Sequence, residues 1–347
     1  MVPNILEIDG SYGEGGGQIL RTAVALAAYT GTPCVIKDIR KGRPNPGLRA
    51  QHLAGLQALA QMCHAEVEGL HLGSQKVIFK PGEIREGDLT IDVGTAGAIG
   101  LVLQTLLLPG IKSQPSIHLT VAGGTDVPWA PTAGYVKEVL FPVLARMGYS
   151  GTIAIHERGY FPAGGGRVSV QLKQPSLSPL ELLERGEVVM IRGLSHASTV
   201  LQQRGVAERQ REAAIEKLKT CPFSYDITVH YENTTSPGSG VDLWVLTENS
   251  ILGANTLGAR GRRAEEVGEQ AAFIVLKQID SRAALDEWMG DQILPFLAVT
   301  GGQSAVSVPR ITNHLRTNLW VITQFLSVTY RIAEEKERAI VEINPLS

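Results

Sequence analysis

The chain has 347 residues, of which 44 % are hydrophobic and 19 % are charged, and its mean hydropathy is +0.04. This composition is typical of a globular protein and excludes a disordered or fibrous chain, and the length predicts two domains. Because 32 Lys and Arg residues are balanced by 34 Asp and Glu residues, the formal net charge of −2 excludes a surface that binds nucleic acid throughout, so any polyanion site must be local.

The three cysteines, Cys34, Cys63 and Cys221, form no CxxC pair, which is typical of a reducing compartment. The N-terminal sequence MVPNILEIDG lacks a charged segment followed by an apolar stretch, so we expect no secretory signal. The longest apolar run, 99–108, contains Gln104 and is too short to span a bilayer. We therefore expect a cytoplasmic protein without a membrane partner.

The hydrophobic pattern predicts a unit of strand, helix, strand, helix and two strands that occurs twice, with an offset of about 83 residues from Ile8 to Ile91. The two openings are alike, IDGSYGEGGGQIL and IDVGTAGAIGLVL. Such a repeat is typical of a fold assembled from copies of one supersecondary unit. The elements of the first unit are expected at 5–8, 17–29, 34–36, 48–62, 65–67 and 76–79, and those of the second at 89–93, 98–108, 116–121, 133–147, 152–156 and 167–172.

A third copy can be assembled from the C-terminal part of the chain, and the stretch before it has a different pattern. The third copy is expected at 284–297, 304–308, 313–325, 328–332 and 339–343, and the elements before it at 187–191, 208–219, 224–231, 241–247 and 264–277. We interpret the second group as an inserted small domain, 186–279, within a large domain made of 1–185 and 280–347. The alternative is a third repeat with long loops.

A glycine-rich loop, Gly13 to Gln18, joins the first strand to a helix that carries Arg21. Backbone N–H groups at a helix start attract anions, and glycines allow a phosphate to approach closely. The loop fits neither the Walker A pattern nor GxGxxG, and it could be no more than a tight turn. Glu14 favours a site that holds both a phosphate and a metal, because a carboxylate beside a phosphate-binding loop is out of place unless a divalent cation lies between the two anions.

The second motif is the basic loop RKGRPNPGLRAQH, 40–52, in which prolines stiffen a run of cations. Arginine side chains bind phosphate oxygens through two parallel hydrogen bonds. A solvated surface loop is the alternative. The third motif, RGYFPAGGG at 158–166, could be only a wide turn between its two flanking strands.

Histidines offer one further candidate. Six of them, including His196, have no partner at metal-ligand spacing, and no HExxH or Cys/His cluster indicates zinc. His314 differs because it begins an apolar helix that Thr312 or Asn313 can cap. A histidine at the positive end of a helix tends to be neutral and therefore nucleophilic, although a helix-start histidine without a role remains the alternative.

Taken together, these segments resemble the RNA 3′-terminal phosphate cyclases over nearly the whole chain. The motifs that carry the resemblance are EGGGQILR at 14–21, RKGRPNPGLRAQH, TAG with LVLQTLLLP through Gln104, RGYFPAGGG and NHLRTN around His314. The resemblance implies an α+β fold: a large domain of three βαβαββ repeats like the C-terminal domain of a translation initiation factor, and a small inserted α/β domain of thioredoxin-like arrangement.

The resemblance also implies the chemistry. A histidine attacks the α-phosphorus of ATP, AMP passes to the 3′-phosphate of RNA, and the neighbouring 2′-hydroxyl closes a 2′,3′-cyclic phosphate. By this match His314 is the nucleophile, and Mg²⁺ or Mn²⁺ lies near Glu14 and Gln104. The matches to phosphate or RNA contacts are Arg21, Arg40, Arg43, Gln51 and His52, and the matches to nucleotide contacts are Gln104, Pro131, Trp288, Met289, Gly290, Asp291 and Gln292.

Pro131 and Trp288 match the two faces that enclose adenine. Family members often carry Tyr or His where this chain has Trp288, and an indole can still stack.

The rival hypothesis is a noncatalytic cyclase-like protein of ribosome assembly, which would lack the histidine and the phosphate contacts. An enolpyruvyl transferase is excluded because three repeats and a small insertion do not make two equal lobes.

Overall fold

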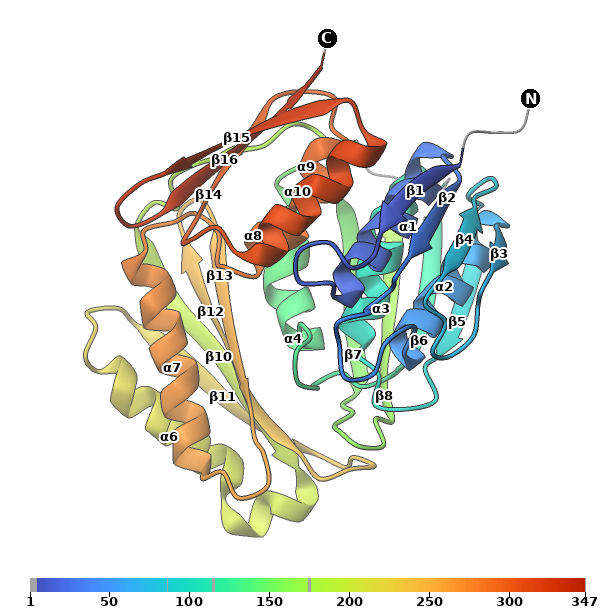
Figure 1. Ribbon diagram of the computed structural model, residues 1–347. Helices are drawn as coiled ribbons and strands as arrows, with labels where there is room; N and C mark the ends of the chain where they lie inside the picture. The colour runs from blue at the N-terminus through green and yellow to red at the C-terminus, as the bar shows by residue number, and fades with distance from the viewer. Residues whose placement is uncertain (1–4, 86, 114–115, 174–175, 347) are drawn as a thin grey trace.

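The computed structural model describes residues 5–85, 87–113, 116–173 and 176–346, which form four four-stranded sheets with helices packed against them (Figure 1). The mixed α and β fold that the sequence predicts is therefore confirmed. None of the helices in these ranges is long and apolar enough to cross a membrane.

The first two sheets have the same strand order, in which the first two strands are parallel and the last two join antiparallel. Their orders are β1-β2-β4-β3 and β5-β6-β8-β7. The first sheet and its helices are β1 (Leu6–Asp9), α1 (Gly17–Thr30), β2 (Cys34–Lys37), α2 (Ala50–Cys63), β3 (Glu66–Glu68) and β4 (Val77–Lys80). The second are β5 (Gly87–Asp92), α3 (Ile99–Leu106), η1 (Pro109–Lys112), β6 (Ser116–Gly123), α4 (Ala133–Tyr135), η2 (Val136–Leu140), α5 (Phe141–Ala145), β7 (Ser150–Glu157) and β8 (Gly166–Lys173).

The third sheet has the order β15-β16-β14-β9, and its strand β9 comes from far earlier in the chain than the other three strands. The short strand β9 pairs parallel with β14 and was not expected from the sequence. The elements are β9 (Glu181–Leu182), α8 (Met289–Gln292), α9 (Leu294–Ala298), β14 (Ser304–Val308), α10 (Asn313–Phe325), β15 (Val328–Glu334) and β16 (Ala339–Pro345).

The single helix expected at 284–297 is wrong in its first part, because helix α8 begins only at Met289. The segment before it pairs with β14: Leu285 N–H donates to the Ser307 carbonyl at 3.1 Å. The buried Asp286 carboxylate then accepts the N–H groups of Trp288 and Met289, at 3.0 and 2.8 Å. These bonds hold the residues before Met289 outside the helix.

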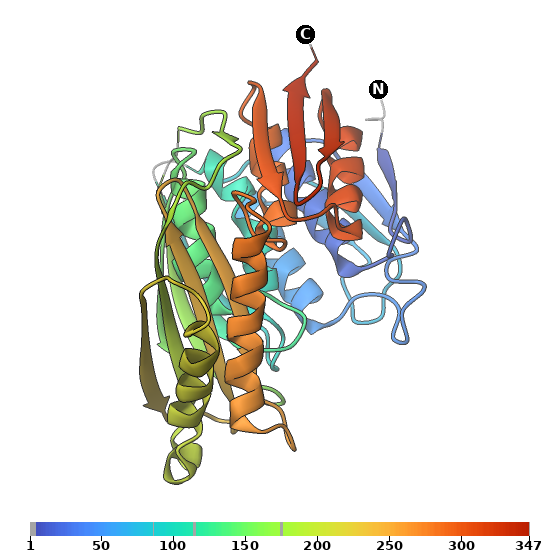
Figure 2. The same cartoon turned by 90° about the vertical axis from the view of Figure 1, so that its left-hand side faces the viewer.

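The fourth sheet, β11-β10-β12-β13, carries α6 and α7 side by side on one face (Figure 2). Strand β13 was not predicted, because its sequence ILGANTL contains small and polar residues and follows β12 after a short turn. The elements are β10 (Val188–Ser198), η3 (Thr199–Arg204), α6 (Val206–Leu218), β11 (Tyr225–Glu232), β12 (Ser239–Thr247), β13 (Ile251–Leu257) and α7 (Ala264–Asp280).

The buried apolar side chains form two main cores. One extends through the first three sheets and their helices, and the other lies between the fourth sheet and helices α6 and α7. The half-buried Trp288 packs against both cores. Trp288 therefore lies where the two parts of the molecule meet.

Candidate active site

A cavity of about 750 Å³ lies where these parts of the chain meet. Its walls come from α1, α3, α8 and α10, from the loop between β6 and α4, and from the end of β13 and the loop after it. Eight residues that belong to the motifs and matches named from the sequence line this cavity: Gln18, Arg21, Gln104, Pro131, Trp288, Asp291, Gln292 and His314. Residues from three separate sequence motifs are thus brought to one cavity.

His314 lies in the first turn of α10, where the Thr312 side chain caps the helix by accepting the Leu315 N–H at 3.0 Å. Gln18 holds the histidine from two sides: its Oε1 contacts the imidazole Nδ1, and its Nε2 donates to the His314 carbonyl at 2.9 Å. The other ring nitrogen, Nε2, faces Glu14. The ring is therefore held in one orientation, with Nε2 as the nitrogen available to a ligand.

The environment keeps His314 neutral at pH 7. Partial burial lowers the pKa of the imidazole, the Glu14 carboxylate raises it, and the positive charges of Arg21 and Arg43 lower it. The net direction is below the ordinary histidine value. A neutral imidazole has a free lone pair and can act as a nucleophile.

Glu14 projects from the glycine loop, whose backbone has positive φ at Gly13 and Gly15, 57° and 55°. Its Oε2 lies 3.3 Å from His314 Nε2 and 3.7 Å from Arg43 Nη2. Arg43 also donates to the Glu14 backbone carbonyl at 3.2 Å. The glycine loop and the basic loop are thus joined by Arg43 beside the histidine.

Arg21 lies one helical turn beyond the glycine loop and donates from Nε to Gln104 Oε1 at 3.1 Å. Gln104 in turn donates to Gln292 Oε1 at 3.0 Å. Burial lowers the pKa of Arg21 to about 10, partly offset by the charge of Asp291, so the guanidinium remains charged at neutral pH. Burial also raises the pKa of Asp291 to about 7. One wall of the cavity therefore presents a fixed positive charge next to a weakly acidic carboxyl group.

The model of the RNA 3′-terminal phosphate cyclase family matches residues 12–332 of this chain. The chain belongs to the RNA 3′-terminal phosphate cyclase family. A protein of that name from Pyrococcus furiosus is 44 % identical over 94 % of this chain and 94 % of its own length. Proteins with the same name from Methanopyrus kandleri and Methanosarcina barkeri are 42 % and 43 % identical, and each alignment covers at least 98 % of both chains.

Among solved structures, the enolpyruvyl transferase NikO from Streptomyces tendae aligns with 97 % of this chain and 48 % of its own, at 12 % identity and a TM-score of 0.40. Similarity at that level carries no statement about fold or activity.

The remaining residues expected from the cyclase resemblance do not line the cavity within the described part of the chain. Arg40 Nη1 donates to the carbonyls of Asn45 and Gly47, at 2.6 and 3.1 Å, and so braces the basic loop. Gln51 is half-buried in the first turn of α2. Met289 is buried in the core, and a Cβ added at Gly290 would lie 2.7 Å from Val308 Cγ1, so both face inward.

His52 behaves as a structural residue of this cyclase-family chain. Its imidazole is 5 % exposed, and Nδ1 accepts the Arg49 N–H at 3.0 Å, which caps α2. Burial, together with the charges of Arg21, Arg40 and Arg49, lowers the pKa of His52 to about 3. His52 is therefore neutral at pH 7 and contributes no positive charge to a phosphate site.

Sequence reasoning missed two residues that organise this site. Sequence patterns assigned Gln18 no role beyond ending the glycine-rich loop, yet Gln18 orients His314. Asn318, on α10, donates to the Asp291 carbonyl at 2.7 Å and accepts the Thr22 hydroxyl at 2.8 Å. Both face the cavity at helical spacing from Arg21 or His314, which is the signal that could have identified them.

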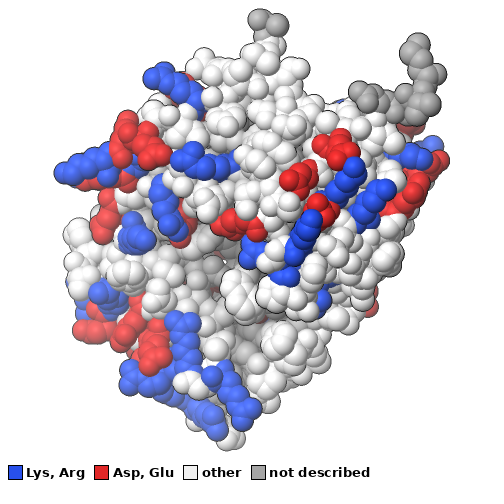
Figure 3. Space-filling view, in the orientation of Figure 1, with Lys and Arg blue, Asp and Glu red and all other residues white. Residues whose placement is uncertain are grey.

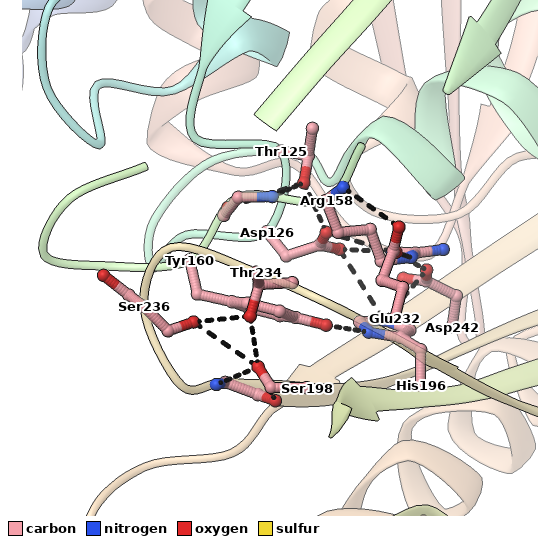
Figure 4. Close-up of polar contacts among 12 residues, drawn as sticks. Thr125, Asp126, Arg158, Tyr160, His196, Ser198, Glu232, Thr234, Ser236 and Asp242 are labelled. Carbon is pink, nitrogen blue, oxygen red and sulfur yellow. Dashed lines mark hydrogen bonds and ion pairs between the residues drawn. The ribbon is translucent and has the colours of Figure 1, made fainter. Parts of the chain in front are cut away.

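The segment 158–166 is more than a wide turn, because Arg158 is the centre of a buried polar cluster at the junction with the fourth sheet (Figure 4). Its Nη1 donates to both Asp126 oxygens, at 2.9 and 3.0 Å, and lies 3.7 Å from Asp242 Oδ2. Tyr160 contributes a hydroxyl 2.7 Å from His196 Nδ1. The sequence shows no partner of His196 at metal-ligand spacing, but the fold places its Nε2 3.6 Å from Asp126 Oδ1 and 3.5 Å from Asp242 Oδ2, which come from distant parts of the chain.

Asp126, His196 and Asp242 have the residue types and spacing of a metal site, with one ligand atom each within 4.8 Å of the others. Arg158, however, already supplies a positive charge to this group. Although burial lowers the pKa of Arg158, the Asp126 and Asp242 carboxylates raise it above its ordinary value. We therefore interpret the cluster as a buried ion-pair network, centred on Arg158, that joins the second and fourth sheets.

Proposed function

We propose that this chain converts an RNA 3′-terminal phosphate to a 2′,3′-cyclic phosphodiester at the expense of ATP, through a covalent His314–AMP intermediate and an RNA adenylate. The observation that carries the proposal is the neutral imidazole of His314 at the wall of a nucleotide-sized cavity, with Arg21 and Arg43 as the positive charges that perturb it. The names of the relatives support the same overall reaction.

In the first step, His314 Nε2 attacks the α-phosphorus of ATP, a P–N bond forms, and pyrophosphate leaves. Gln18 orients the ring during this attack through its contact with Nδ1. Arg21 and Arg43 stabilise negative charge on the phosphates, which increases as the bond to pyrophosphate breaks. Pro131 and Trp288 face the same cavity, and we propose that adenine lies between them.

In the second step, an oxygen of the RNA 3′-phosphate attacks the phosphorus of His314–AMP, and the histidine leaves as the P–N bond breaks. In the third step, the 2′-hydroxyl oxygen attacks the 3′-phosphorus, its proton passes to water, and the bond to AMP breaks so that AMP leaves. A phosphate monoester is a poor electrophile, and adenylylation gives it AMP as a leaving group. All atoms of ATP are thereby accounted for as pyrophosphate and AMP.

Glu14 and Gln104 carry oxygen donors whose chemistry suits a divalent metal. The carboxylate of Glu14 is 36 % exposed, and the amide oxygen of Gln104 retains a lone pair beside its bond from Arg21. Such oxygens are the ligands that Mg²⁺ and Mn²⁺ prefer, and we propose that these two residues hold the ion. A bound ion would neutralise charge on the departing pyrophosphate.

The finer fold description is also a proposal. We propose three βαβαββ copies in a large domain, 1–185 and 280–347, with a thioredoxin-like domain inserted at 186–279. The common order of three sheets supports it, because β9 occupies in the third sheet the place that β1 and β5 occupy in theirs. The insertion then lies within the third copy, between its first strand and first helix.

A noncatalytic ribosome-assembly relative is not favoured, since His314, Glu14, Arg21 and Arg43 are all present and interact. The test uses an oligoribonucleotide with a 3′-phosphate, ATP and Mg²⁺ or Mn²⁺. We expect two products in equal amounts: AMP, and an oligoribonucleotide whose 3′ end resists phosphatase. Binding of both substrates without either product would support the noncatalytic alternative.

A further inference from the structure

Trp129 is the most exposed large hydrophobic side chain of the described residues, with 97 % of its surface accessible. It lies in the loop between β6 and α4 and lines the rim of the cavity together with Pro128, Ala130 and Pro131. An indole left in water at the rim of a binding cavity has no packing role. Its exposure is the feature that requires a functional reason.

The backbone holds Trp129 in a conformation that side chains rarely adopt, with φ of 60°. The loop beneath it is anchored: Thr125 N–H donates to the Gly159 carbonyl at 2.9 Å, and Ala133 N–H donates to the Thr125 carbonyl at 2.9 Å. Asp126 is fixed by Arg158 in the buried cluster (Figure 4). The junction cluster therefore supports a strained loop that presents the indole in a defined place.

Positive charge faces the same cavity from the fourth sheet. The loop after β13, 258–263, contains Arg260, Arg262 and Arg263 and no acidic residue. Arg262 lines the cavity and donates to the Leu257 carbonyl at 3.1 Å. Arg260 and Arg263 are exposed, and Arg263 Nε also donates to Glu266 Oε1 at 3.1 Å. Figure 3 shows Lys and Arg side chains gathered at the lower end of the fourth-sheet region, with acidic side chains beside them, across a hollow from a second group of Lys and Arg side chains.

We propose that Trp129 stacks on the base of the RNA nucleoside that carries the 3′-phosphate, and that Arg260 and Arg263 bind phosphates on its 5′ side. This inference rests on the proposed cyclase function. Exposed aromatic rings next to cations are how proteins bind single strands without reading sequence. The arrangement accepts any 3′-terminal base, because every base has a stacking face.

The alternative ligand for Trp129 is the adenine of ATP, and exposure argues against it. Pro131 and the half-buried Trp288 already provide apolar surfaces inside the cavity. A mononucleotide can be enclosed there, whereas a polynucleotide must continue beyond the rim. Trp129 lies at that rim, and Arg260 is exposed on the 258–263 loop, which reaches the cavity through Arg262, so both can contact the longer ligand.

The first experiment compares Trp129→Phe and Trp129→Leu. Trp, Phe and Leu are equally disfavoured by the positive φ at position 129. The two substitutions therefore change the side chain without relieving the backbone strain. Tyr330→Leu is the matched control, because Tyr330 is an aromatic residue on β15, 45 % exposed, that does not line the cavity. Affinity for a labelled oligoribonucleotide of about ten nucleotides with a 3′-phosphate is measured by anisotropy without ATP.

We expect Trp129→Leu to weaken RNA binding by about fivefold to a hundredfold, the range of one lost base stack, and Trp129→Phe to retain most of the affinity. In a separate arm, the ATP dependence of protein labelling is measured without RNA. The loss in RNA affinity should exceed any loss in ATP affinity. Equal RNA affinity of the Leu variant and wild type, or a loss confined to ATP, would overturn the assignment of Trp129.

The second experiment tests the arginines with Arg260→Ala, and with Arg192→Ala as control, since Arg192 is exposed on β10 outside the cavity. Arg260→Ala should weaken binding of the oligonucleotide and reduce its salt dependence by about 0.7 in the log–log slope, but leave a nucleoside 3′-monophosphate unaffected. An unchanged slope would overturn the proposal that Arg260 binds an RNA phosphate. Because binding is measured without ATP, these outcomes are independent of whether the wild-type chain becomes labelled.

Discussion

His314 Nε2 lies 3.3 Å from Oε2 of Glu14, which joins the start of α10 to the glycine loop before α1. This contact brings an anion to the nitrogen that attacks ATP in the proposed mechanism. Burial and two arginines favour the neutral imidazole, and Glu14 alone opposes them. The balance between these groups determines the pH at which the imidazole of His314, the proposed nucleophile, is neutral.

The pH dependence of His314 adenylylation follows from this balance. The pKa of His314 is lowered below the ordinary value of 6.5. The rate of adenylylation should therefore be at its maximum at pH 7 and fall only as the pH drops below 6.5. Because the Glu14 charge raises that pKa, Glu14→Gln should move the acid limb to still lower pH. Initial labelling rates between about pH 4.5 and 8 measure both limbs, and a limb displaced toward higher pH in the variant would contradict this electrostatic account.

Glu14→Gln should also change the metal requirement. The substitution removes the only charged oxygen of the proposed metal pair, so a higher Mg²⁺ or Mn²⁺ concentration is needed and the maximum rate falls. Titrating the metal at saturating ATP and pH 8 separates this effect from the pH shift. An unchanged metal requirement, together with the loss of a pH limb near neutrality, would identify Glu14 as a general base instead.

Arg21→Lys and Arg43→Lys should each slow adenylylation about tenfold to a hundredfold. A lost hydrogen bond to a charged group costs about 1.5 to 3 kcal/mol, and a point charge does not replace a planar fork. Arg40→Lys should act differently, through a looser basic loop, because Arg40 bonds the carbonyls of Asn45 and Gly47. Single-turnover labelling measures the rates, with Arg192→Lys as the control. Wild-type rates for Arg21→Lys and Arg43→Lys would show that neither contacts phosphate.

Arg158→Met should destabilise the folded chain by about 3 to 5 kcal/mol, since it leaves Asp126 and Asp242 buried without their cation. Urea unfolding measures the change in the free energy of unfolding. Adding Asp126→Asn to Arg158→Met should recover part of the loss, because one uncompensated charge is removed. If the single variant unfolds at the wild-type urea concentration, the cluster does not hold the junction together.

Local patterns predicted much of this structure, and long-range contacts limited the rest. The helix expected at 313–325 and its Thr312 cap are observed, because both depend on neighbouring residues. Strand β13 was missed because pairing with β12, and not its own composition, makes it a strand. The polar cluster was missed because Asp126, Arg158 and Asp242 meet only after the fourth sheet packs against the second. The motifs identified the residues around His314, but not the contact with Gln18.

The most direct test of the account is to incubate the protein with α-labelled ATP and Mg²⁺ or Mn²⁺ and to map the label on the denatured chain. His156→Ala is the matched control for His314→Ala, because His156 is an exposed histidine on β7 that does not line the cavity. We predict an acid-labile, base-stable label on His314 in the wild type and in His156→Ala, and no label in folded His314→Ala. Persistent labelling of His314→Ala, or an adduct mapped to a lysine, would contradict it.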